Sequence, residues 1–80
     1  MPDKPPVFFE EVEQLSAIAH QSDEALGLVR DFSLLNAISI SLSFYGHESA
    51  EEAADINQQY VRVSRIADHM RAIAEPLLAA

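Results

Sequence analysis

The stretch SAEEAADINQQYVRVSRIADHMRAIAE, residues 49–75, decides the fold that we predict for this chain. It begins with Ser49 followed three residues later by Glu52, which is the capping-box signature of a helix start. Acidic residues gather in its first half and basic residues in its second, as the helix dipole favours. Because no Gly or Pro interrupts it before Pro76, the sequence predicts one helix over 49–75 that ends ahead of this proline.

Apolar side chains recur along this predicted helix with alternating steps of three and four residues. That spacing places them in one narrow stripe, which is the arrangement that packs against a partner helix. The stripe consists of Ala53, Ile56, Tyr60, Val63, Ala67, Met70, Ala74 and Leu77. A helix about 37 Å long cannot bury such a stripe by itself, so other helices must cover it.

The composition indicates one small acidic domain that needs a partner. The chain has 80 residues, no cysteine, and a net charge of −8. A chain this short buries only about 60–65% of its unfolded surface, and no disulfide adds stability, so we expect association. An acidic surface repels phosphate backbones and anionic membranes, so we expect neither nucleic-acid nor membrane binding.

Nothing in the sequence directs the protein out of the cytoplasm. The start of the chain has no apolar signal-peptide region, and no uninterrupted apolar run approaches the roughly 18–20 residues of a membrane-spanning helix. We therefore expect a cytoplasmic protein. The first six residues contain three prolines, and we predict a flexible arm over 1–6 followed by a single helical domain over 7–80.

Two further helices are predicted ahead of residue 49, over about 7–20 and 22–45. Ser22 followed by two acidic residues resembles a fresh helix start, which favours a break near residue 21. The apolar spacing nevertheless continues across this junction, so a single helix over 8–45 remains an alternative.

The second of these helices is unusual because residues 32–46 contain no charged side chain. A helix that is apolar nearly all round is typically buried, and its buried serines can bond to the carbonyl four residues back. Residues 38–44 also alternate polar and apolar, which is the period of a strand. We favour the helix because no second strand is available to pair with this segment.

A short turn at 46–48 completes the predicted architecture. Gly46 suits the left-handed position that follows a helix, and the brevity of the turn predicts an antiparallel helical hairpin. In this register Asp31 approaches Arg62 and Arg65, and acidic residues 23 and 24 approach Arg71 and His69. The fold class is therefore all-α, a hairpin plus an N-terminal helix, and we expect a homodimeric bundle to bury the surplus apolar surface.

The sequence carries no recognisable catalytic or metal-binding pattern. The histidines at 20, 47 and 69 have no companions at metal-ligand spacing, and no sharp strand-turn-helix serine motif occurs. We therefore expect no enzyme activity, no cofactor and no metal. The expected function is a small acidic protein–protein interaction module, namely a regulator, inhibitor or chaperone-like subunit that packs its helices against a homodimer partner or a heterologous protein.

The alternative function is a carrier or phosphorelay module that uses Ser33 or a histidine. In size, acidity and helical content the chain resembles acyl carrier proteins, in which the serine of an Asp-Ser-Leu motif at a helix start carries phosphopantetheine. The nearest stretch here is Asp31-Phe32-Ser33-Leu34, where a phenylalanine separates the acid from the serine and the position is inside a predicted helix.

The candidate interface residues come from the charge-free segment and from the stripe of the long helix. They are Phe32, Leu35, Ile38, Leu42, Tyr45, Tyr60, Val63 and Met70.

Overall fold

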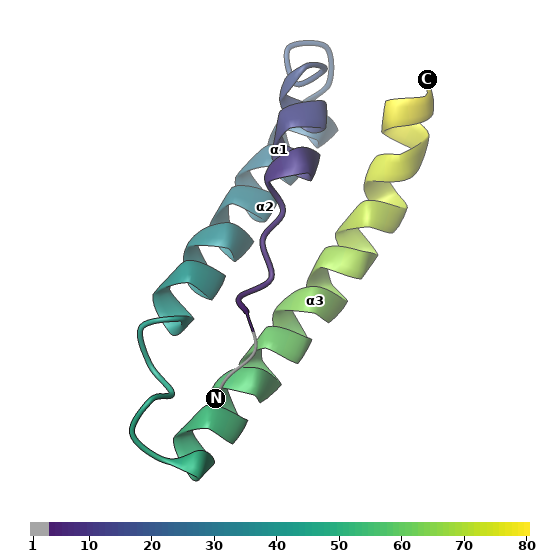
Figure 1. Cartoon of the computed structure of the whole chain (residues 1–80). Helices are drawn as coiled ribbons and strands as arrows, with labels where there is room; N and C mark the ends of the chain where they lie inside the picture. Colours follow the sequence, from purple (N-terminus) through teal and green to yellow (C-terminus); the bar gives the residue numbers. More distant parts are fainter. Residues whose placement is uncertain (1–3) are drawn as a thin grey trace.

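Three helices make up the fold of residues 4–80, which are the residues that the computed structural model describes. They are α1 (Phe9–Ser16), α2 (Asp23–Leu42) and α3 (Ala50–Ala79). In Figure 1, α2 and α3 run in opposite directions on either side of a connecting loop, and α1 packs chiefly against α2. The molecule is a rod of 46 × 18 × 15 Å. The all-α prediction is confirmed.

The junction between α1 and α2 is a true break in the helix. α1 is shorter than the predicted 7–20, because residues 17–21 form tight turns closed mainly by i to i+3 backbone bonds. Ser22 then caps α2, and its Oγ accepts a hydrogen bond from the Ala25 N–H at 3.2 Å. The break near residue 21 is therefore confirmed, and the single helix over 8–45 is wrong.

The alternating segment in the second half of α2 is helical. The helix continues to Leu42, so the strand interpretation of 38–44 is wrong, and no part of residues 4–80 forms a strand with which it could have paired. α2 ends before the predicted residue 45, and turns follow. Gly46 has a φ of 86°, the left-handed conformation that the sequence predicts, but it lies in the loop beyond the end of the helix.

The start of α3 uses a modified capping box. Ser49 is the N-cap, and its Oγ accepts a hydrogen bond from the Glu52 N–H at 3.0 Å, as predicted. The Glu52 carboxylate does not return to Ser49 but accepts a hydrogen bond from the Gly46 N–H at 2.8 Å. This contact fastens the loop to the first turn of α3.

The end of α3 differs from the prediction, because the helix continues through Pro76 to Ala79. Proline has no N–H and its ring clashes with the carbonyl four residues earlier, so it disfavours a helix interior, yet α3 keeps its helical assignment through it. Leu77 is partly buried against the core, and this packing stabilises the turn beyond the proline. A tertiary contact thus overrides a local signal.

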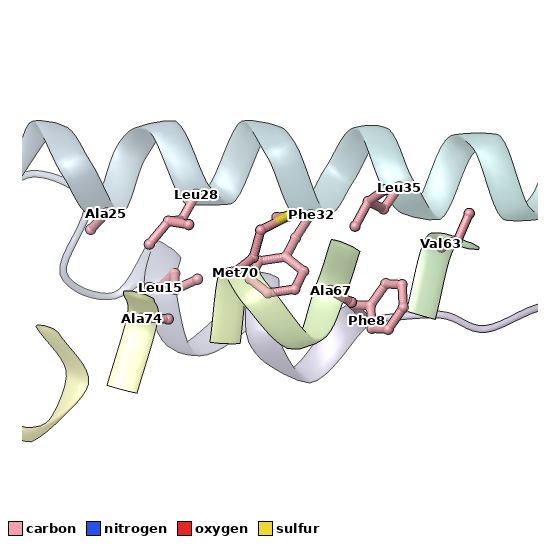
Figure 2. Close-up of a cluster of buried hydrophobic side chains, with 10 residues drawn as sticks. All are labelled: Phe8, Leu15, Ala25, Leu28, Phe32, Leu35, Val63, Ala67, Met70 and Ala74. Atoms are coloured by element: carbon pink, nitrogen blue, oxygen red, sulfur yellow. The ribbon is translucent and has the colours of Figure 1, made fainter. Parts of the chain in front are cut away.

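The core lies between the inner faces of α2 and α3 and is closed by the N-terminal part of the chain. Figure 2 shows Phe32 and Leu35 extending from α2 toward Met70 and Ala67 of α3. The buried hydrophobic cluster comprises Phe8, Leu15, Ala25, Leu28, Phe32, Leu35, Val63, Ala67, Met70 and Ala74.

The segment before α1 is part of this core. It runs between α2 and α3 (Figure 1), and the Phe8 N–H donates a hydrogen bond to Oδ1 of Asn36 on α2. The Phe8 ring is buried with its centroid 5.8 Å from that of Phe32. Of the predicted arm, residues 1–3 lie outside the described residues, and Pro5 and Pro6 are half-buried.

α2 is also long and apolar enough, by length and composition alone, to cross a membrane. The sequence contains no uninterrupted apolar run of this length, because Arg30 and Asp31 interrupt α2. The mean hydropathy over 18 residues is nevertheless high despite these two charged side chains. This observation is weak evidence, because core helices of water-soluble proteins have the same length and composition.

Candidate interaction surfaces

The predicted interface residues divide between the interior and the surface. Five of them face the chain's own core or are otherwise buried, namely Phe32, Leu35, Tyr60, Val63 and Met70. Burial raises the pKa of the Tyr60 hydroxyl, because the charged phenolate would lose its hydration. The other three, Ile38, Leu42 and Tyr45, remain at least partly accessible at the loop end of α2.

These three residues belong to a larger apolar area, which we call the outer patch. The outer patch comprises Leu34, Ile38, Leu42, Phe44 and Tyr45. Two members that the sequence analysis did not name as interface residues are widely exposed, since Leu34 is 59% and Phe44 75% exposed. A signal for them was present, because the whole area lies inside the charge-free segment 32–46.

A shallow depression of about 290 Å³ lies within the outer patch. It is lined by Ala37, Ile38, Ser41, Leu42 and Tyr45. Phe44 is the chain neighbour of Tyr45 and leaves most of its ring in solvent. The outer patch therefore carries both a projecting aromatic ring and a hollow, and neither is covered within the described part of the chain.

A second concave area lies between α1 and the C-terminal turns of α3, and we call it the acidic cleft. Its volume is about 690 Å³. It is lined by Glu10, Glu11, Gln14, Leu15, Arg71, Ala74, Glu75, Leu78 and Ala79. The floor is apolar, because Leu15 and Ala74 belong to the core, and Leu78 is 38% exposed.

Arg71 is held in a fixed position at the acidic cleft. Its Nε and Nη2 donate hydrogen bonds to Oε2 of Glu11 at 2.9 and 2.7 Å, and Nη1 donates to Oδ1 of Asp68 at 2.9 Å. The guanidinium lies 5.2 Å from the centroid of the Phe8 ring, within cation–π range. The contact between Glu11 and Arg71 thereby joins α1 to α3.

This pairing replaces the charge register that the sequence predicts. Within residues 4–80, Arg71 pairs with Glu11 and Asp68 and not with acidic residues of α2. No ion pair joins Asp31 to Arg62 or to Arg65 in the described part of the chain. At Arg71 the predicted partners are replaced because α1 brings the Glu11 carboxylate to this arginine.

The residues of the alternative carrier or phosphorelay function are scattered. Ser33 is exposed in the interior of α2, at a distance from its N-terminus. His20, His47 and His69 are all exposed and lie on different elements, and His47 contacts only the Ser43 carbonyl through Nε2 at 3.1 Å. No group of three or more metal-ligating side chains occurs among residues 4–80.

Comparisons with known protein families, with characterised proteins and with solved structures found no match. The functional interpretation therefore rests on the two surfaces. The segments that line them lie toward opposite ends of the rod in Figure 1, those of the outer patch near the loop before α3 and those of the acidic cleft near the end of α3.

Proposed function

We propose that the protein is a small protein–protein interaction module that acts by helix packing, and that the outer patch binds a second copy of the chain. The observation that carries this proposal is the exposure of large apolar side chains along the second half of α2 and the following turn. Contiguous apolar area of this kind marks interaction sites in water-soluble proteins.

The charge distribution favours a second copy as the occupant. Each chain has a net charge of −8, so two copies repel one another across most of their surfaces. The outer patch is the exception, because residues 32–46 carry no charge. Two copies that meet there bury apolar surface without bringing like charges into contact.

The shape of the outer patch supports a two-fold interface. In such an interface the same surface of both subunits meets, so a projection and a hollow must be present on one patch. Phe44 provides the projection, and the depression beside Ile38 and Leu42 provides the hollow. In the proposed dimer, Phe44 of each subunit enters the depression of its partner.

The test is the solution mass, measured by light scattering on a sizing column across a dilution series. We expect a mass near twice 8.8 kDa for the natural chain. Phe44→Glu places a charge in the proposed contact, and we expect it to weaken association at least tenfold. Phe44 lies in a turn and is largely exposed, so the helical content should not change.

The matched control is Ile73→Glu on α3. Ile73 is 53% exposed and gains the same charge, but it lies outside the outer patch. We expect its association to equal that of the natural chain. A monomer at every concentration, or equal weakening by both variants, would contradict the proposed dimer.

A further inference from the structure

We propose that the acidic cleft binds a basic amphipathic segment of another protein. This binding site is separate from the outer patch and does not depend on the dimer. The two surfaces are lined by different residues, so occupation of one leaves the other accessible.

Charge complementarity identifies the occupant as basic. The single cation that lines the cleft, Arg71, is already shared by Glu11 and Asp68. Glu10 and Glu75 then remain without an ion pair anywhere in residues 4–80. The Glu10 carboxylate accepts only a 3.3 Å hydrogen bond from the Gln14 side chain. A lysine or arginine of a partner would supply the missing positive charge.

The floor of the cleft identifies the occupant as amphipathic. Leu78 is partly exposed there beside Ala79, and the acidic side chains stand around them. A helix that presents an apolar residue with basic residues three or four positions away would place the apolar side chain on this floor and its charges at the rim. A second copy of this chain is a poor occupant, because its own charge is −8.

The acidic cleft is preorganised, because contacts within the chain already hold α1 and the last turns of α3 in place. Arg71 ties α1 to α3 through Glu11, and Leu77 holds the last turns of α3 against the core. The side chains that line the cleft therefore need little rearrangement, which lowers the entropic cost of binding.

The test uses a fluorescein-labelled helical peptide of leucine and lysine as the probe, with fluorescence anisotropy as the readout. A peptide of the same pattern with glutamate in place of lysine is the comparison probe. We expect the lysine peptide to bind and the glutamate peptide not to bind. Amide NMR shifts should map to Glu10, Gln14, Glu75 and Leu78.

Two charge-matched variants separate the cleft from general attraction to an acidic protein. Glu10→Gln with Glu75→Gln should weaken binding of the lysine peptide by more than about twofold and up to about twenty-fivefold, since each exposed ion pair contributes up to about fivefold. Asp31→Asn with Asp55→Asn removes the same charge elsewhere, and we expect less than about a twofold change from the lower net charge alone. Equal weakening by both double variants, or NMR shifts confined to the outer patch, would overturn the proposal.

Discussion

The two halves of α2 hold similar numbers of apolar side chains, but only the first half carries charged residues, and the surroundings of the two halves differ. In the first half, over 23–32, α1 packs on one side and α3 on another, and Ala25, Leu28 and Phe32 are buried. In the second half, over 33–42, Leu34, Ile38 and Ile40 remain exposed. The difference arises because α1 is only 8 residues long, so its cover does not extend along the whole helix.

This comparison separates apolar character from burial. A helix that lacks charge needs cover, but its sequence does not say whether the same chain or another chain provides that cover. In the first half the cover is intramolecular. In the second half the inner face is covered by α3 and by residues 4–8, and the outer face is the proposed interface.

The largest expected effect comes from shortening one apolar side chain to alanine in each half of α2. Phe32 is fully buried, so we expect Phe32→Ala to lower the free energy of unfolding by about 3–5 kcal/mol through lost transfer energy and a cavity. Leu34→Ala, two residues further on, should change it by less than about 0.5 kcal/mol in the monomer. Urea unfolding followed by circular dichroism measures both.

Protein concentration distinguishes the two variants further. If the outer patch forms a dimer, the cost of Leu34→Ala should rise with concentration while that of Phe32→Ala stays nearly constant. Similar losses for both variants at low concentration would show that the outer face is covered within the chain, and the contrast between the halves would fail.

Residue spacing was sufficient to predict the helices and most of the core. The stripe predicted along α3 has eight members, of which Ile56, Tyr60, Val63, Ala67, Met70 and Ala74 are buried and Ala53 and Leu77 are partly buried. The spacing could not reveal that Phe8 lies between α2 and α3. The Phe8 N–H bonds to Asn36, which is 28 positions away in the chain, and local spacing carries no information about such a contact. Likewise Pro76 is a local helix-breaking signal, yet α3 continues through it, and Leu77 beyond it packs against the core.

The candidate sites were predicted only in part. Ile38, Leu42 and Tyr45 were named because the charge-free segment is visible in the sequence, and all three are at least partly accessible. The acidic cleft was not found, since its rim combines Glu10 of α1 with Glu75 of α3 and depends on how these helices pack. No sequence spacing relates the two carboxylates.

A smaller effect is expected at Asn36, which anchors the segment that covers the second half of α2. Its Oδ1 accepts the hydrogen bond from the Phe8 N–H in a buried location. Asn36→Ala leaves that N–H without a partner, so we expect a loss of about 1–3 kcal/mol in unfolding free energy. The Phe8 amide should also exchange its hydrogen faster.

Asn36→Leu distinguishes the hydrogen bond from simple packing, because leucine keeps the branched outline of the asparagine side chain, at a larger volume, and has no acceptor. We expect it to remain at least about 1 kcal/mol less stable than the natural chain. Full stability of this variant would mean that the segment over 4–8 is held by the Phe8 ring alone.

The smallest expected effect has the opposite sign and concerns Ser39, in the second half of α2. Ser39 is fully buried, yet its Oγ has no hydrogen-bond partner, contrary to the expectation that buried serines bond to a preceding carbonyl. Ser43, which is partly exposed, donates a hydrogen bond to the carbonyl of Ile40, three residues back. An unpaired buried hydroxyl is unfavourable, so Ser39→Ala should raise the unfolding free energy by about 1 kcal/mol.

The control is Ser33→Ala, at an exposed site on the same helix. It should gain only the helix propensity of alanine, about 0.5 kcal/mol. Urea unfolding of both variants measures the difference, which isolates the cost of the buried hydroxyl. A loss of stability in Ser39→Ala would mean that this hydroxyl has a bonding partner in solution, which a buried water could provide.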